Sequence, residues 1–282
     1  MSQILPFGRA TVAASPKLSL QAVTKSYRQG GGAQIQAIDE ISLDVGMGEF
    51  VCLIGPSGCG KSTLLNLAAG LDRPDSGRVL MDGRPIDGPG PERAVLFQEP
   101  ALFPWLDVLG NVEIALRFAG VGPEDRRGRR ELARRWLEKV GLGAFAGAQP
   151  HELSPGMRQR AALARALACQ PQVLLADEPF GALDAQSREL LQRELQSVWL
   201  ETRNTFVFVT HNVREAVFLA DRVIMMSARP GTLLSEHRIS APRPRSFEDV
   251  LLAKVVVDVH DHLLEEVEHG VEVEGDGLTD LA

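Results

Sequence analysis

The segment "IGPSGCGKSTLLNLAAG", residues 54–70, follows an apolar run and contains four glycines, one lysine and a leucine-rich run. It contains the pattern Gly55-x-x-x-x-Gly60-Lys61-Ser62. Glycines allow consecutive backbone N–H groups to curl around an anion, and a helix that begins near Lys61 directs its positive end to the same point. Because a strand precedes the pattern and a helix follows it, the segment predicts a phosphate-binding loop.

In this interpretation the loop binds ATP, with Lys61 reaching the β and γ phosphates and the Ser62 hydroxyl holding Mg²⁺. The alternative is that the segment is an ordinary glycine-rich turn. For Cys59, a further alternative is that a cysteine occurs there only because it is small. If Cys59 does face the nucleotide, alkylation inhibits the protein and ATP protects it. The loop residues predicted to contact the nucleotide are Gly55, Pro56, Ser57, Gly58, Cys59, Gly60, Lys61, Ser62 and Thr63.

A second stretch, "VLLADEP" at residues 173–179, adds acidic groups at the end of an apolar strand. Ligands of α/β sheets collect at the carboxyl ends of the strands. Asp177 is therefore predicted to hold Mg²⁺ through water, and Glu178 to polarise the attacking water as general base. The alternative is that the two acids only begin a turn before Pro179.

A third stretch, "ELSPGMRQRAALARAL", supplies Ser154 as an N-cap and Pro155 at the first helical position, with Gly156 leaving the backbone open. A plain helix start explains this pattern. The alternative is a second anion-binding helix terminus, which makes sense if it serves the nucleotide of another subunit.

Composition bounds the class of protein. The chain has 282 residues, 44% of them hydrophobic, which is enough for one large or two modest domains. No apolar run reaches the ~18 residues of a membrane-spanning helix, and three unrelated cysteines (Cys52, Cys59 and Cys169) favour a reducing compartment. The net charge of -7 is concentrated in residues 246–282, which carry eleven acids and one lysine. The rest is mildly basic, so charge says little about partners.

Strands alternate with helices along the chain. Short strands are expected within 18–54, and further strands at "QVLLAD", "TFVFVT" and "RVIMMS". Helices are expected after Lys61, ending at Gly70, and at about 155–169, 186–201 and 212–220. The pattern predicts a largely parallel sheet with helices on both faces.

Between about 101 and 150 two helices are expected, "NVEIALRFAG" and one opened by Pro123, Glu124 and Asp125 in its first turn. The arginines of the second helix are either a phosphate-binding patch or, as we favour, a solvated face. They are Arg126, Arg127, Arg129, Arg130, Arg134 and Arg135.

Taken together, "GPSGCGKST", "LFQEPALFPW", "LSPGMRQR", "LLADEPFGALD" and "VTHNVREA" resemble the ATP-binding subunit of an ABC transporter over roughly residues 17–245. The resemblance implies an α/β fold, with a P-loop NTPase (RecA-like) core, an antiparallel β subdomain and an inserted helical subdomain at about 101–160. Residues 1–16 are then an N-terminal extension, and 246–282 an acidic C-terminal extension.

The same resemblance implies roles for further residues. Ser154 and Gly156 would contact the γ-phosphate bound by the opposite subunit. Gln98 would sense the γ-phosphate and metal site and relay its state to a membrane partner. Asp184 would lie at the dimer seam, and His211 would steady the γ-phosphate. Tyr27, the only tyrosine, precedes the loop at a distance suited to the adenine-stacking aromatic; the alternative is an ordinary half-buried strand tyrosine.

The implied assembly is a homodimer that sandwiches ATP, bound to transmembrane permease subunits at the cytoplasmic face of the inner membrane and served indirectly by a substrate-binding protein. No nucleic acid is expected. The stretch "LFPWLDVLGNV" and "LSPGM" are similar to the nitrate, sulfonate and taurine importer group. Two departures, Pro155 for a glycine and Met157 for a glutamine, remove an N–H group and a capping-box partner.

Alternatives from other classes are another importer or exporter, a soluble ABC-type ATPase, and a non-catalytic regulatory cassette. Intact Lys61, Asp177, Glu178 and His211 speak against the last. In the acidic tail, His262, Glu266 and His269 fall near one helical face and form a candidate metal site, but we favour a solvated acidic helix and predict no metal there. The role of the tail stays open.

Overall fold

The computed structural model describes residues 3–6, 15–28 and 33–276, with side chains for 15–28 and 33–263. The chain forms two compact units. The first comprises Met1–Gly88 and Val207–Ala282, and the second comprises Pro89–Phe206. The predicted phosphate loop belongs to the first unit and the predicted acidic pair to the second, so each unit is described by itself.

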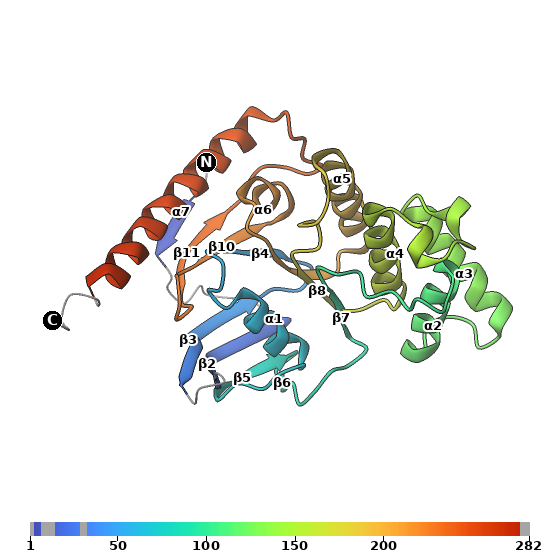
Figure 1. Ribbon diagram of the computed structural model, residues 1–282, viewed down its shortest axis with the longest axis horizontal. Helices are drawn as coiled ribbons and strands as arrows, with labels where there is room; N and C mark the ends of the chain where they lie inside the picture. The colour runs from blue at the N-terminus through green and yellow to red at the C-terminus, as the bar shows by residue number, and fades with distance from the viewer. Residues whose placement is uncertain (1–2, 7–14, 29–32, 277–282) are drawn as a thin grey trace. The chain divides into compact units, whose positions relative to one another are not determined.

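The main sheet of the first unit is built around the strand that enters the phosphate loop (Figure 1). Strand β4 (Phe50–Ile54) is buried at every residue and runs parallel to β10 (Arg222–Met226), with Val51 opposite Arg222. The carboxyl-terminal part of β9 (Thr205–Val209) lies on the other side of β4. These buried, β-branched runs confirm the predicted parallel strands, because a strand covered on both faces is apolar throughout.

Antiparallel strands continue this sheet beyond β10, and the sequence analysis did not predict them. Strand β11 (Leu233–Arg238) pairs antiparallel with β10, and β1 (Gln3–Pro6) pairs antiparallel with β11. The predicted N-terminal extension therefore contributes a strand. The pattern "LLSEHR" lacks a long apolar run, and one of its two partners, β1, is distant in the sequence.

A second sheet of the first unit is antiparallel, as predicted. Its strand order is β3 (Gln34–Val45), β2 (Leu18–Arg28), β5 (Ser76–Met81) and β6 (Arg84–Pro85). Helix α1 (Lys61–Ala69) follows the phosphate loop and ends where Gly70 adopts φ 73°, a left-handed conformation that favours glycine. The predicted helix end is confirmed.

The second unit joins a short parallel sheet to a helical cluster. Strands β7 (Arg93–Leu96) and β8 (Val173–Asp177) are parallel. The helices are α2 (Val108–Ala119), α3 (Arg126–Lys139), η1 (Gly143–Phe145), η2 (Pro150–Glu152), α4 (Pro155–Ala168) and α5 (Ala185–Thr202). Apolar residues of α2, α3 and α4 form one buried cluster. This unit is longer than the predicted helical subdomain at 101–160, and the predicted domain boundaries stay predictions.

The start of α3 differs from the prediction. Pro123, Glu124 and Asp125 were expected in its first turn, but the helix begins at Arg126. Asp125 is the N-cap, with extended backbone, and its carboxylate accepts the amide of Gly128 at 2.8 Å. A capping side chain satisfies a first-turn amide from outside the helix, which explains the shift.

The C-terminal segment is anchored to the first unit by a buried arginine. Arg245 is 5% exposed and donates to the carbonyls of Val217 and Ala220 at the end of α6 (Val213–Leu219), at 2.9 and 2.6 Å. It also donates to Ile239. Burial lowers the pKa of Arg245 to about 10. These bonds satisfy helix-end carbonyls that have no partner within the helix.

The tail forms helix α7 (Val250–Asp276), which lies beside α6 and β11 in Figure 1. Leu252 and Val259 are buried, so the described part of α7 packs against the unit on one face. The favoured interpretation of a solvated acidic helix is therefore incomplete for this part, because one face is buried. Glu266 and His269 of the candidate metal site lie outside the residues whose side chains are described. None of the described helices is both long and apolar enough to cross a bilayer.

His237 of β11 is buried beneath α7, and its Nδ1 atom has no hydrogen-bond partner among the residues whose side chains are described. Its ring centroid lies 5.3 Å from that of His262 on α7. Burial lowers the pKa of His237, the charge of His262 lowers it further, and Asp258 opposes the shift. The folded state therefore resists protonation of this ring.

We predict that acid destabilises the protein through His237. Below pH ~6.5 the unfolded chain takes up a proton that the folded chain resists, so the free energy of unfolding falls as pH falls toward the lowered pKa. Urea unfolding at pH 7.5 and 5.5 measures this loss. His237→Gln should show a smaller loss, and His151→Gln, at an exposed histidine, should show the wild-type loss. Equal losses in both variants contradict the assignment.

Candidate functional site

The phosphate loop connects buried β4 to α1 and leaves no room for side chains at its end. Gly60, the N-cap of α1, has φ 96°. A Cβ atom there would lie 2.6 Å from Ile38 Cδ1 and 2.7 Å from the carbonyl oxygen of Ala37. Because a backbone atom cannot yield as a flexible side chain can, this position requires glycine. The N-cap makes no side-chain hydrogen bond to the first turn of α1, where helix-end amides can bind an anion.

Lys61 brings a buried positive charge to the loop. It is 6% exposed, and its Nζ donates to the carbonyls of Gly55 at 2.9 Å and Pro56 at 2.8 Å. Cys59 Sγ lies 3.7 Å from the same nitrogen. The ammonium thus lies inside the curl of the loop, at the positive end of α1. Cys59 itself is 1% exposed, so its predicted alkylation requires the loop to open.

Tyr27 lies next to the first turn of α1. Its hydroxyl bonds the Thr63 side chain and donates to Asp72 Oδ2 at 2.8 Å. Burial raises the pKa of Tyr27, while the bond to Thr63 opposes that shift. Lys25 Nζ lies 5.3 Å from the ring centroid and pairs with Asp72 at 2.7 Å. The side chain is 42% exposed, so the structure holds the ring by one end and leaves part of it accessible.

His211 belongs to the same edge of the sheet as the loop. It follows β9, and the neighbouring Thr210 donates its amide to the carbonyl of Leu53 in β4 at 3.1 Å. The carboxyl ends of parallel strands meet at one edge. Within the first unit, the structure therefore brings His211, Lys61 and Ser62 to that edge.

In the second unit, a side-chain amide and a carboxylate lie close together near the end of β8. Glu178 has φ 42°, which is unusual for a residue with a side chain. A Cβ atom placed on Gly181 would lie 3.5 Å from Gln98 Nε2 and 3.7 Å from Glu178 Oε2. The side chains of Gln98 and Glu178 thus converge on Gly181, while Asp177 ends the strand.

The N-termini of α4 and α5 meet in the second unit. The Ser154 hydroxyl accepts the amide of Met157 at 3.3 Å, so the cap forms without a capping-box glutamine. Asp184 caps α5 by accepting the amide of Ser187 at 2.9 Å, and hydrogen bonds from Ser187 lower its pKa. A Cβ atom on Gly156 would lie 3.6 Å from Ser187 Cβ. The structure therefore places Ser154, Gly156 and Asp184 in one group.

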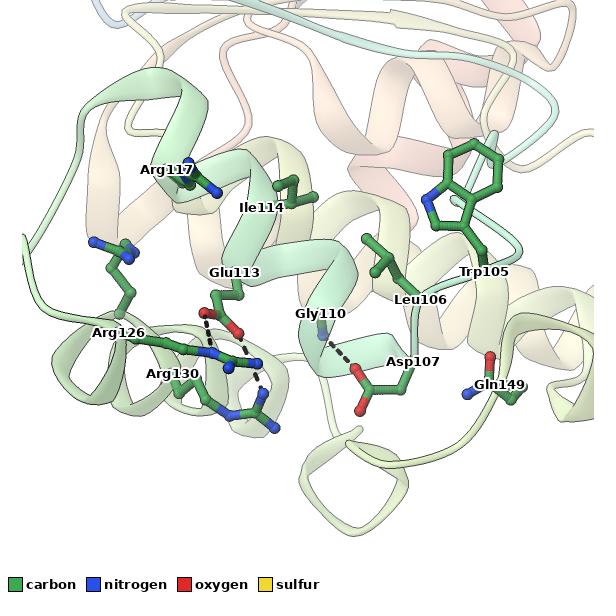
Figure 2. Close-up of a pocket in the computed structure, with 11 residues that line it drawn as sticks. Trp105, Leu106, Asp107, Gly110, Glu113, Ile114, Arg117, Arg126, Arg130 and Gln149 are labelled. Atoms are coloured by element: carbon green, nitrogen blue, oxygen red, sulfur yellow. Dashed lines mark hydrogen bonds and ion pairs between the residues drawn. The ribbon is translucent and has the colours of Figure 1, made fainter.

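A cleft of about 530 Å³ lies between α2 and α3 in the second unit. Figure 2 shows Trp105 and Leu106 along one side and Arg126 and Arg130 along the other. Glu113 pairs with both arginines, at 3.4 and 3.3 Å, and Trp105 is 73% exposed. The favoured interpretation of the α3 arginines as a solvated face is thus incomplete, because part of the row lines a cleft.

The sequence analysis missed residues 227–232, which follow β10. Arg229 donates from Nε to the Gly58 carbonyl at 3.2 Å, and Gly231 packs against Cys59. The Pro-Gly pair signals a turn after a buried strand, but it gives no information about what the turn contacts.

The first unit fits a nucleoside triphosphate and its magnesium ion. The loop carries helix-end amides, a buried ammonium and the Ser62 hydroxyl, and its glycines let the backbone curl tightly against neighbouring protein atoms that would clash with a Cβ. Phosphate oxygens and a hard cation use these donor and acceptor types.

We predict that Gly60→Ala loses ATP affinity by at least about tenfold and destabilises the protein by ~1–3 kcal/mol, because the added Cβ meets the Ala37 backbone. Gly83→Ala is the matched control. Gly83 also has a left-handed φ, 74°, but its Cβ would meet nothing within 4 Å. Titration calorimetry and thermal unfolding measure the two effects. If both variants bind ATP equally, the close contact is not what the loop requires.

The ABC transporter family model matches residues 38–181. A putative ATP-binding protein of Brucella abortus is 51% identical over 82% of this chain and 86% of its own length. The nitrate import ATP-binding protein NrtD of Synechococcus elongatus is 45% identical over 89% of this chain and 91% of its own. The bicarbonate transport ATP-binding protein CmpD of the same species is 43% identical over 89% and 90%.

Solved structures agree with this assignment. The dimeric structure of the bacterial ABC transporter cassette MJ0796 is 35% identical, with a TM-score of 0.72, and covers 80% of this chain and 100% of that one. A second structure of the same cassette, in a post-hydrolysis state bound to ADP and Pi, has a TM-score of 0.71 at 34% identity. The P-loop NTPase fold is therefore confirmed. This chain belongs to the ABC transporter family, as its ATP-binding, ATP-hydrolysing subunit.

Proposed function

We propose that this protein couples MgATP binding and hydrolysis to the import of a small anion through a separate permease. The observation that carries the proposal is the buried ammonium of Lys61 inside the loop at the N-terminus of α1. Relatives named for nitrate import and bicarbonate transport support the anion. Within that class, a nitrate-, sulfonate- or taurine-like solute fits the motifs around Trp105 and Ser154.

The geometry of the first unit supports the roles proposed for its residues. Lys61 exchanges its two loop carbonyls for oxygens of the β and γ phosphates, while loop amides donate to the same phosphates. The accessible part of the Tyr27 ring stacks on adenine. His211 donates a hydrogen bond to the γ-phosphate from the same sheet edge.

The second unit supplies the acidic groups. Asp177 and the Ser62 hydroxyl hold magnesium, which neutralises charge on the phosphates when bound. Glu178 accepts the proton of the attacking water. Gln98, whose side chain lies beside Gly181 as that of Glu178 does, senses the γ-phosphate and the metal. Because the backbone of Glu178 is left-handed, its side chain does not follow the alternating side-chain directions of the strand before it.

We propose that two copies of the chain associate head to tail around two ATP molecules. The Ser154 hydroxyl and the Gly156 amide of one copy contact the γ-phosphate held by the other, with Asp184 at the seam. The grouping of the α4 and α5 N-termini supports this proposal, since both present positive helix ends. Pro155 has no N–H group to donate to the phosphate. If ATP turnover by this protein is slow, the missing donor at Pro155 is the first explanation to test.

The permease contact is assigned to the cleft between α2 and α3. Exposed Trp105 offers an aromatic anchor, and the paired arginines offer charge around it. A permease bound there would hold this subunit at the cytoplasmic face of the membrane, with a substrate-binding protein acting through the permease. Co-purification from native membranes identifies the permease.

A soluble ATPase acting on nucleic acid and a transporter of another subgroup are the rival functions. Fractionation distinguishes the first, because a transporter subunit pellets with membranes only when its permease is present, whereas a nucleic-acid ATPase binds duplex with a marked salt dependence. Uptake by vesicles that contain the purified complex, tested with nitrate, taurine and bicarbonate, distinguishes the second.

Glu178→Gln should bind ATP with near-native affinity and lose ~10²–10⁴-fold in turnover, because only the proton acceptor is removed. Lys61→Ala should lose binding itself. Glu189→Gln, at an exposed carboxylate of α5, is the control and should behave as wild type. Phosphate release and equilibrium ATP binding measure the two properties. Undiminished turnover in Glu178→Gln removes it as the base.

Trp105→Ala and Arg130→Glu should each abolish co-purification of the permease, because the first removes the anchor and the second reverses a charge in the cleft. ATP binding by the isolated subunit should stay unchanged. Arg135→Glu introduces the same charge at an exposed α3 residue outside the cleft lining. Retention of the permease by Arg130→Glu, or its loss with Arg135→Glu, places the contact elsewhere.

A further inference from the structure

Residues 227–232, "SARPGT", form a compact segment after β10, which we name the buttress segment. It is held by its own bonds. The Ser227 hydroxyl donates to the Pro230 carbonyl at 3.0 Å and accepts the Thr232 amide at 2.8 Å. The Ser227 amide in turn donates to the Thr232 carbonyl at 3.1 Å. Residue 229 is therefore presented from a closed turn.

The buttress segment packs its backbone against the phosphate loop. Gly231 donates its amide to the Ala37 carbonyl at 3.0 Å and accepts the Asp39 amide at 3.0 Å. A Cβ atom on Gly231 would lie 2.0 Å from the carbonyl oxygen of Cys59. The carbonyl of Ala37 is also the atom that excludes a side chain from Gly60. One strand edge thus positions both the loop and the buttress segment.

Arg229 holds the preceding peptide of the loop. Its Nε and Nη2 atoms donate to the Gly58 carbonyl at 3.2 and 3.1 Å. In a trans peptide the carbonyl and the following N–H point in opposite directions. A guanidinium that holds the Gly58 carbonyl therefore fixes the direction of the Cys59 amide, a loop amide that donates to the Pro56 carbonyl at 3.4 Å and that a bound phosphate would have to draw away.

We propose that Arg229 is a positioning residue for the nucleotide, which sets ATP affinity by fixing the Gly58–Cys59 peptide. This inference rests on the proposed binding of ATP by the loop. Gly58 has φ 77° and is exposed, so its peptide has conformational freedom that a contact can remove. A loop ordered before binding loses less entropy when phosphates arrive.

The two-nitrogen contact also predicts which substitutions rescue binding. Lysine keeps the charge but reaches the carbonyl as a single mobile ammonium, whereas the planar guanidinium donates from two nitrogens at once. Arg229→Lys should therefore recover part of the affinity. A simple charge effect on the phosphates would instead let lysine recover all of it.

The experiment compares Arg229→Ala, Arg229→Lys and Arg238→Ala. Arg238 is an exposed arginine of β11 that pairs with Glu236, so its removal changes the net charge equally without touching the loop. We expect Arg229→Ala to raise the Kd for ATP about 10-fold, Arg229→Lys about 3-fold, and Arg238→Ala less than 2-fold. The KM for ATP should follow these changes, with kcat at saturating ATP within about twofold of wild type.

Further readouts separate positioning from charge and from misfolding. If Arg229 fixes a peptide, the change in Kd is the same for ATP and ADP and the same at low and high salt. If it acts as a charge, the change is larger for ATP and shrinks with salt. The melting temperature without nucleotide should be unchanged in Arg229→Ala. Wild-type ATP affinity in this variant, full rescue by lysine, or a salt-dependent effect each overturns the inference.

The outcome is distinct from a failure of the proposed function. If the wild-type protein does not bind ATP, the proposed function fails and Lys61→Ala shows no further loss. If the wild-type protein binds ATP and Arg229→Ala binds it equally, only the role of Arg229 fails.

Discussion

The phosphate loop depends on the hydrogen bonds that the buried ammonium of Lys61 donates to two loop carbonyls. Removing a charge from water is costly, so the loop must surround it with acceptors. Two loop carbonyls do so, and their direction obliges the chain between β4 and α1 to curl. Strand β4 is buried throughout and cannot shift to relieve the curl. The conformation of the loop is therefore set by the hydrogen bonds of its own lysine and by contact with the backbone of Ala37.

That neighbouring backbone is a second constraint of the same kind. The Ala37 carbonyl contacts the space beside Gly60 and also accepts the amide of Gly231. Glycine is required at both positions because each brings two backbones closer than a side chain permits. Three segments distant in the sequence, those of Ala37, Gly60 and Gly231, are thus in contact. A substitution in any of them is expected to change the conformation of the loop.

The two units carry different chemical groups. The first presents an ammonium, backbone amides and the Tyr27 ring, which suit phosphates and a base. The second presents the carboxylates at the end of β8 and the paired helix N-termini of α4 and α5. In the proposed function, phosphate binding uses the groups of the first unit and metal-assisted hydrolysis those of the second. The cleft beside Trp105 is separate in chemistry, with an aromatic anchor and paired charges.

The sequence by itself determined the features that depend on residues close together along the chain. The phosphate loop, the buried strands and the end of α1 at Gly70 follow from local pattern, since periodicity and the backbone freedom of glycine act over a few residues. The start of α3 was misplaced because Asp125 suits both a first turn and a cap, and only the observed hydrogen bond distinguishes them. Family motifs supplied the expected roles of Gln98, Asp184 and His211.

Tertiary structure alone decided which distant residues meet. Strand β11 is recognised by its pairing with β10 and not by its composition. Arg126 and Arg130 line a cleft because Glu113 of another helix faces them, and Arg229 reaches the loop because β10 lies beside β4. Likewise, α7 buries Val259 although its sequence is acidic. These contacts join residues of different helices, strands and turns, and no local pattern encodes the partner of a side chain.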